Sequence, residues 1–381
     1  MLKQNSDSIF MEISCSLNLC NIRYISTHTQ QQFVISILYS QQPQAISNKL
    51  MSQYWTAIAQ LMLLPLCSAL FTLYTLPKFL PLLLQKNLGG FDLNKPREHQ
   101  TEKTPEAAGI VLLISFCIFS APLNSHLRVS LISAGLLGFV DNVLDLKWRW
   151  KIIIPLFQLI ELGMYHIGLG CIELELPFMN LKLSYLSPFL VIIYSIISQN
   201  LVNIYAGING LEIGQSIVAQ VFLFTYVTIR DGFSSILSLN LDFAILTALF
   251  VSGSFVLYQY NKYPAKAFVG DVYTYFAGSC YVASAVSGRA VVLSIFLYFM
   301  QIINCGASLP QLLKIVPCPR HRLLELRKDG KLYGQKCNWN NINQFSLKVF
   351  RRGLFEYQLF NYLMIIQIFV SLIVVFVALY V

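Results

Sequence analysis

The sequence predicts an all-α polytopic membrane protein with about ten transmembrane helices and an active site on the cytosolic face. Hydrophobic residues make up 56% of the 381 residues and charged residues only 12%, whereas a soluble chain carries about 25% charged residues. Apolar runs recur along the chain, and most of them approach the roughly 20 residues that a helix needs to cross a bilayer. These two observations together exclude a soluble globular protein.

The spans follow from the apolar runs in chain order. The first run is long enough for a tilted helix, and the last one closes the chain after the longest polar loop. The third and fourth runs are short and nearly adjacent, which favours tilted or partly re-entrant segments. The predicted spans are 55–84, 107–123, 129–146, 151–170, 185–203, 213–230, 241–259, 270–286, 290–310 and 358–381.

Basic residues in alternate loops predict the orientation. Residues 311–352, after the ninth span, hold ten Lys and Arg against two acids, and the loops after the first, third and seventh spans are also basic. By the positive-inside rule these odd-numbered loops face the cytosol and both termini lie outside. The net charge of +9 comes mostly from 311–352. Because no aromatic residues alternate with these charges, we expect an anionic substrate or lipid headgroups as partners, and no nucleic acid.

The chain divides by composition near residue 50. Residues 1–50 are polar and rich in Gln and Ser, so we expect a disordered extension, or a segment ahead of a translation start at Met51. No cleaved signal sequence is indicated. Residues 51–381 form the predicted integral membrane domain, with a cytosolic loop at 311–357. The nine cysteines include no CxxC pair, so neither a disulfide framework nor a zinc site is expected.

Residues 200–212 carry three asparagines, two glycines and a glutamate at the mouth of a predicted span. Polar groups at that depth are costly unless they line a cavity or serve a site. By the predicted topology, further polar groups reach the same cytosolic face. They are Asp92 and Lys95, Glu106, the segment 138–145, Lys151, the segment 268–271 and the segment 317–322.

The residue types in these groups indicate magnesium and phosphate chemistry. Asp141 and Asp145 are four residues apart, which places them on one helical face beside basic residues. Asp271 with an asparagine carbonyl suits Mg²⁺, which takes one or two protein carboxylates. Each group has an alternative: an interfacial helix end for Asp141, and a helix cap for Asp271. Arg320, His321 and Arg322 suit phosphate recognition, and topogenic charge is the alternative for them and for Lys151.

Seven ordered segments then resemble the polyprenyl-phosphate N-acetylhexosamine-1-phosphate transferases, and most closely the eukaryotic branch that acts on dolichyl phosphate. The resemblance runs from about residue 86 to 322 and loosely on to 381. The segments are DLNK (92–95), PE (105–106), GFVDNVLDLKWRWK (138–151), NIYAGINGLEIGQS (203–216), YPAKAFVGD (263–271), SLPQLL (308–313) and PCPRHR (317–322).

The resemblance implies transfer of GlcNAc-1-phosphate from UDP-GlcNAc to dolichyl phosphate with release of UMP, the first step of lipid-linked oligosaccharide synthesis for N-glycosylation. It also implies a multi-pass protein of the endoplasmic reticulum membrane, a homodimer, inhibition by tunicamycin, and Mg²⁺ with Mn²⁺ as a substitute. The residue roles it implies are Asn203 and Asp271 as metal ligands, Phe268, Leu93, Gly207 and Asn209 at uridine, Glu106 near the nucleotide, Lys151 and Arg320 at the pyrophosphate, and His321 and Arg322 at the GlcNAc moiety.

One position departs from the family pattern, because Asp141-Asn142 stands where the family has paired aspartates. Asn142 cannot accept a proton or offer a full charge, so we expect catalysis to depend on Asp141 with help from Asp145. A low-activity homologue and a relative that uses another UDP-linked amino sugar are the alternatives. A secondary transporter is a third interpretation, but it predicts internal repeats, and none is evident in the sequence.

Overall fold

The computed structural model describes residues 43–95, 102–147, 149–170, 175–176, 181–182, 186–316, 324–335, 340–350 and 352–380. The chain divides into two units, Met1–Thr56 and Ala57–Val381. Within the first unit, the described residues belong to the beginning of helix α2 (Pro43–Gln85). The predicted extension over residues 1–50 falls mostly on residues outside this description and stays a prediction.

Long apolar helices confirm the all-α polytopic membrane class. Among the described residues, six helices are long and apolar enough to cross a membrane. They are α2 from Met51 on, α4 (Ser125–Leu144), α7 (Ser187–Tyr205), α8 (Leu211–Asp231), α10 (Leu241–Asn261) and α15 (Glu356–Tyr380). Helices α12 (Val291–Leu297) and α13 (Phe299–Leu312) bend by 64° at Tyr298 and would make a seventh span together.

The other three predicted spans are also helical, but they differ from ordinary spans. Helix α3 (Gly109–Phe119) has only 11 residues. The fourth predicted span is broken at Leu159 into α5 (Trp150–Gln158) and α6 (Ile160–Gly168). Helix α11 (Gly270–Ser287) is rich in Ser, Thr and Tyr. The total of ten spans therefore stays a prediction.

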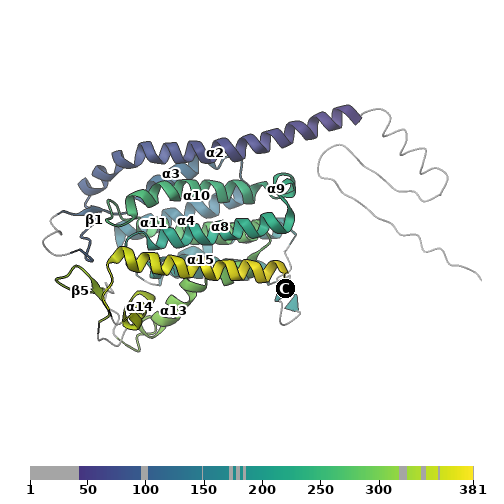
Figure 1. The fold of residues 1–381 in the computed structure, drawn as a ribbon. Coiled ribbons are helices and arrows are strands. Elements are labelled where there is room, and N and C mark those ends of the chain that lie inside the picture. Colours follow the sequence, from purple (N-terminus) through teal and green to yellow (C-terminus); the bar gives the residue numbers. More distant parts are fainter. Residues whose placement is uncertain are drawn as a thin grey trace, which may run out of the picture. The chain divides into compact units, whose positions relative to one another are not determined.

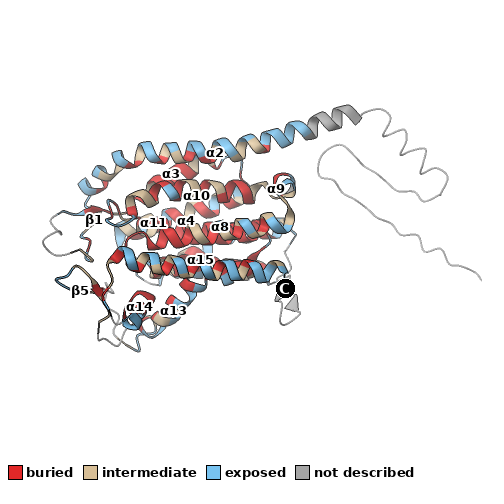
Figure 2. Ribbon diagram, in the orientation of Figure 1, coloured by how far each residue is buried: buried red, intermediate tan, exposed pale blue. Residues whose placement is uncertain are grey.

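Helix α11 is the centre of the second unit. Its residues from Val272 to Ser287 are all buried, and its closest neighbours are α4 and α7. Figure 1 shows α11 and α4 behind α8 and α10, with α15 beside α8. In Figure 2 the helices α2 and α15 carry exposed residues along their outer faces, and on α15 these include Ile365, Phe369 and Phe376. Exposed apolar faces of this kind suit lipid contact.

Two glycines allow α11 to approach its neighbours at backbone distance. A Cβ on Gly138 of α4 would overlap the carbonyl of Asp271 and lie 2.7 Å from the Cα of Val272. A Cβ on Gly278 of α11 would lie 2.5 Å from the backbone nitrogen of Gln199 on α7. Backbone atoms cannot give way as a flexible side chain can, so both positions require glycine.

The alanine variant of Gly138 is expected to lose about 1–3 kcal/mol of stability and most of its activity, because overpacking pushes α4 away from Asp271. Gly306→Ala is the matched control, since Gly306 is an exposed residue of α13 and nothing lies within 4 Å of the added Cβ. Thermal unfolding in detergent measures both variants. Equal melting temperatures for the two would contradict the close approach.

Several short elements were not predicted by the hydropathy pattern. Strand β1 (Gly89–Gly90) pairs antiparallel with β2 (Thr104–Pro105), and this hairpin places residues 91–94 and Glu106 at one end of the bundle. Strand β3 (Glu175–Leu176) pairs with β4 (Leu181–Lys182). The predicted loop at 311–357 contains the strand pair β5 (Glu325–Leu326) and β6 (Leu332–Tyr333), together with helix α14 (Ile342–Phe350).

Candidate active site

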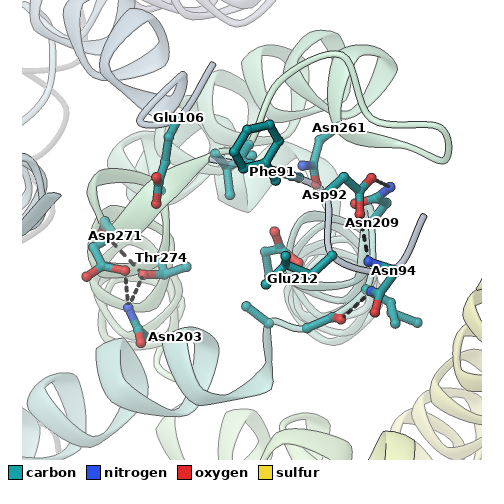
Figure 3. Close-up of a pocket in the computed structure, with 17 residues that line it drawn as sticks. Phe91, Asp92, Asn94, Glu106, Asn203, Asn209, Glu212, Asn261, Asp271 and Thr274 are labelled. Carbon is teal, nitrogen blue, oxygen red and sulfur yellow. Dashed lines mark hydrogen bonds between the residues drawn. The ribbon is translucent and has the colours of Figure 1, made fainter. Parts of the chain in front are cut away.

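A cavity of about 250 Å³ opens where α7 ends and where α8 and α11 begin. Figure 3 shows Asn203, Asp271 and Thr274 on one side of it, here called the Asp271 side. Asp92, Asn94 and Asn209 lie on the other side, here called the Asp92 side. The lining comprises residues 91–94, 106, 203, 206–209, 212, 261, 268–271 and 274.

The Asp271 side is built on the first turn of α11. Gly270 directly before Asp271 has φ +73°, and an added Cβ there would lie 2.7 Å from Ala107 Cα, so glycine is needed at this turn. Asn203 Nδ2 donates to Asp271 Oδ1 at 2.6 Å and to Thr274 Oγ1 at 3.1 Å. The carboxylate of Asp271 is 29% exposed, so it can meet a ligand in the cavity.

Lys151 lies between the two acids of this side. Its Nζ is 2.7 Å from Asp141 Oδ2 and 3.8 Å from Asp271 Oδ2. Asp141 is buried and also accepts from the Tyr275 hydroxyl at 3.0 Å and from the backbone N–H of Leu146 at 2.9 Å. Because Asp141 is so fully engaged, its position suits holding Lys151 beside Asp271 better than binding a ligand directly.

Asn142 has a structural contact that the sequence did not indicate. Its Oδ1 accepts from the backbone N–H of Val272 at 3.1 Å, which ties the end of α4 to the first turn of α11. Asparagine and aspartate both offer this acceptor. The departure from the paired-aspartate pattern therefore leaves this contact intact.

The expectation that Asp145 shares a helical face with Asp141 is wrong. Helix α4 ends at Leu144, and Asp145 is its C-cap in the left-handed conformation, with φ 51°. The helical spacing of four residues no longer applies beyond the last turn, so the exposed side chain of Asp145 leaves the face that carries Asp141.

The role of Asn142 can be tested directly. Asn142→Asp is expected to change turnover by less than about fivefold, because the acceptor for Val272 N–H is kept. Asn142→Leu is expected to lose about 1–3 kcal/mol of stability, since it leaves that N–H without its partner. Turnover and melting temperature of both variants check this. A large rise in activity for Asn142→Asp would show that the missing carboxylate limits the enzyme.

The Asp92 side is a network of buried polar groups. Asn209 Nδ2 donates to Asp92 Oδ2 at 2.9 Å, and Lys95 Nζ lies 3.2 Å from the same oxygen. Glu356, at the start of α15, accepts from the backbone N–H of Asn209 at 2.6 Å. Asn94 Nδ2 donates to the carbonyl of Gly207 at 2.9 Å. These contacts hold the segment between α7 and α8 against the first hairpin and the last helix.

The Asp271 side fits a magnesium ion rather than an all-protein metal cage. Among the residues that the structure describes, no three His, Cys, Asp or Glu side chains gather as a metal site. Mg²⁺ keeps several waters and binds through one or two carboxylates plus substrate phosphates. Asp271 supplies such a carboxylate, and Asn203 would supply its carbonyl oxygen after its amide turns, because its NH2 now faces Asp271.

Most predicted site residues in the described part of the chain meet at this cavity. Leu93, Glu106, Asn203, Gly207, Asn209, Phe268 and Asp271 all line it, and Lys151 and Asp141 lie directly beside Asp271. Arg320, His321 and Arg322 lie outside the described residues.

Several further residues of the site are not indicated by the sequence pattern. Asn94 and Asn261 line the cavity, Thr274 contacts Asn203, and Tyr275 donates to Asp141. Glu356 is the clearest omission, since it is an acid at the mouth of the last predicted span. That is the same signal that drew attention to Asp271, and it would have identified Glu356 too.

The fold and cavity define an integral membrane protein whose cavity, at one end of the helices, brings carboxylates, amides and a nearby lysine together. This arrangement suits a transferase acting at a membrane surface. The model of the glycosyl transferase family 4 matches residues 126–289. A UDP-N-acetylglucosamine–dolichyl-phosphate N-acetylglucosaminephosphotransferase of Dictyostelium discoideum is 32% identical over 343 residues, covering 79% of this chain and 84% of the relative. The chain belongs to this family of phosphotransferases.

Two further relatives carry the same name. The protein of Saccharomyces cerevisiae is 36% identical over 218 residues, which cover 54% of this chain and 49% of the relative. The protein of Leishmania amazonensis is 28% identical over 386 residues, covering 71% of this chain and 83% of the relative. A phospho-N-acetylmuramoyl-pentapeptide-transferase of Clostridium botulinum is similar at 29% identity over 247 residues.

Proposed function

We propose that this protein transfers GlcNAc-1-phosphate from UDP-GlcNAc to dolichyl phosphate, giving GlcNAc-diphosphodolichol and UMP. The observation that carries the proposal is the cavity itself, with Lys151 between Asp141 and Asp271 at one side and the amides of Asn94 and Asn209 at the other. A cation beside a carboxylate on the Asp271 side suits a metal-bound pyrophosphate, and the amides of the Asp92 side suit a nucleoside.

Direct displacement is the reaction that these residues support. An oxygen of dolichyl phosphate attacks the β-phosphorus of UDP-GlcNAc, the bond from that phosphorus to the α-phosphate oxygen breaks, and UMP leaves with that oxygen. The acceptor needs little help from a base, because the second pKa of a phosphate monoester is about 6. Asp141 is engaged with Lys151, Tyr275 and Leu146, so its assigned role is to position Lys151.

Lys151 stabilises the negative charge that shifts onto the leaving UMP, while Asp271 and Asn203 would hold Mg²⁺. When bound, Mg²⁺ would neutralise part of the pyrophosphate charge. Phe268, Leu93, Gly207 and Asn209 are assigned to the uridine, Glu106 to the nucleotide side, and Arg320, His321 and Arg322 to the pyrophosphate and the GlcNAc moiety. Asp145 is assigned no role toward the substrates, because α4 ends before it.

We place the protein in the endoplasmic reticulum membrane as a homodimer, with the cavity facing the cytosol. Support for this orientation comes from basic residues at the cavity's end of the helices: Lys95 lies between the strands of the first hairpin, and Lys151 lies in the first turn of α5. The dimer rests on family membership alone.

Purified protein with UDP-GlcNAc, dolichyl phosphate and Mg²⁺ is expected to release UMP only when both substrates are present. Competition with other UDP-linked amino sugars tests the sugar, and GlcNAc is expected to be preferred. If natively folded protein released no UMP under these conditions, the proposal would be contradicted.

A further inference from the structure

Asn209 is held from two directions on the Asp92 side of the cavity. Its backbone N–H donates to Glu356 Oε1 at 2.6 Å, and its side-chain Nδ2 donates to Asp92 Oδ2 at 2.9 Å. Asn209, Asp92 and Glu356 are 6%, 5% and 3% exposed, so this arrangement is largely shielded from water. In such surroundings a polar group that loses its partner is costly, and the amide of Asn209 has little freedom to turn.

Asp92 determines which end of the Asn209 amide faces the cavity. A carboxylate paired with Lys95 accepts hydrogen bonds and donates none, so it must face the NH2 of Asn209. The Oδ1 of Asn209 is then directed away from Asp92. Among the described residues this oxygen has no hydrogen-bond partner. It is not fully buried, and Asn209 lines the cavity. The cavity wall therefore presents a fixed acceptor.

Asp92 is itself held in one orientation. Its Oδ1 accepts from the backbone N–H of Asn94 at 3.3 Å, which leaves Oδ2 for Asn209 and Lys95. The carboxylate, the amide and the cavity-facing oxygen thus form a chain in which each member fixes the next.

The charges of the cavity decide what meets this acceptor. Lys151, the cation beside Asp271, favours the pyrophosphate on the Asp271 side of the cavity. The opposite side, with Asp92 and Asn209 (Figure 3), is then left for the base of the nucleotide. Uracil carries an N–H donor at N3, whereas cytosine carries a lone pair there. We propose that Asp92 is a positioning residue that locks the amide of Asn209 and thereby makes the cavity select uracil over cytosine; this inference rests on the proposed function.

Nucleotide binding by the unaltered protein is the first part of the test, and it does not depend on turnover. UMP is expected to bind at least about tenfold more tightly than CMP or 3-methyl-UMP, because the latter two cannot donate at N3. Equal binding of UMP and 3-methyl-UMP would overturn the proposal.

Asp92→Asn is the decisive variant. Residue 92 would then carry an NH2 as well as an oxygen, so it would no longer require the NH2 of Asn209 to face it, and the Oδ1 of Asn209 would no longer be fixed toward the cavity. The UMP-to-CMP affinity ratio is then expected to fall at least about tenfold. Glu356→Gln is the matched control: it acts on the same residue through the backbone, so it should weaken both nucleotides alike and keep the ratio.

The outcomes separate the inference from the proposed function. An unchanged ratio in folded Asp92→Asn, with UMP release by the unaltered protein, would overturn the inference alone. A protein that binds no uridine nucleotide would overturn both. If Asp92→Asn fails to fold, the 3-methyl-UMP comparison on the unaltered protein decides.

Discussion

Replacing Asp271 by alanine is expected to lower turnover by about a thousandfold or more while leaving the protein folded. Asp271 is a partly exposed carboxylate of the cavity, within reach of both Asn203 and Lys151. The stabilisation that a metal ligand of this kind supports amounts to several kcal/mol, and about 4 kcal/mol corresponds to a thousandfold. The fold should tolerate the change, because removing one of two neighbouring carboxylates reduces their mutual repulsion.

The matched control for Asp271→Ala is Asp231→Ala. Asp231 ends α8, a helix of 21 residues and so about 30 Å long, and its carboxylate pairs with Arg230 rather than with the cavity. UMP release and melting temperature should be measured for both variants. Full activity of Asp271→Ala would show that the metal site is assigned wrongly.

Lys151→Met is expected to have the second-largest effect, with a loss of about a hundredfold or more in turnover and about 3–5 kcal/mol in stability. The stability loss follows because Asp141, whose side chain is 1% exposed, would be left buried without its cation. The turnover loss follows because the cation next to Asp271 would no longer meet the pyrophosphate.

Lys151→Arg is the informative companion variant, since it keeps the charge and changes the geometry. It should recover most of the stability and part of the turnover. Steady-state kinetics and thermal unfolding distinguish the two effects. If Lys151→Met were as stable and active as the unaltered protein, Lys151 would be ordinary loop charge.

Hydropathy predicted the fold class well, because a membrane helix must satisfy its backbone internally and face lipid with apolar residues. Hydropathy predicted individual helices less well where a helix is surrounded by protein and not by lipid. Helix α11 is surrounded by protein, so its sequence can be polar. The fourth predicted span breaks at Leu159, between Pro155 and Glu161, inside a run whose average hydropathy is continuous. Helix α14 and the strand pairs are too short for a clear periodic signal.

At the site, the sequence identified residue types better than their roles. The motifs and the predicted topology placed Asn203, Asp271 and Lys151 at one site, and in the structure these three residues lie next to one another. They did not indicate that Gly138 serves helix contact, that Asn142 accepts from Val272, or that α4 ends before Asp145. Such roles depend on contacts between helices distant in the chain, which spacing within one segment cannot reveal.

The position of the β-phosphorus after turnover tests the proposed reaction most directly. Purified protein is incubated with dolichyl phosphate, Mg²⁺ and UDP-GlcNAc labelled with ³²P at the β-phosphate, and the lipid and nucleotide fractions are separated. Transfer of the sugar phosphate predicts that the label enters the lipid and that one UMP forms for each labelled lipid. Label that remains in the nucleotide as UDP would instead show transfer of the sugar alone and would contradict the proposed displacement at the β-phosphorus.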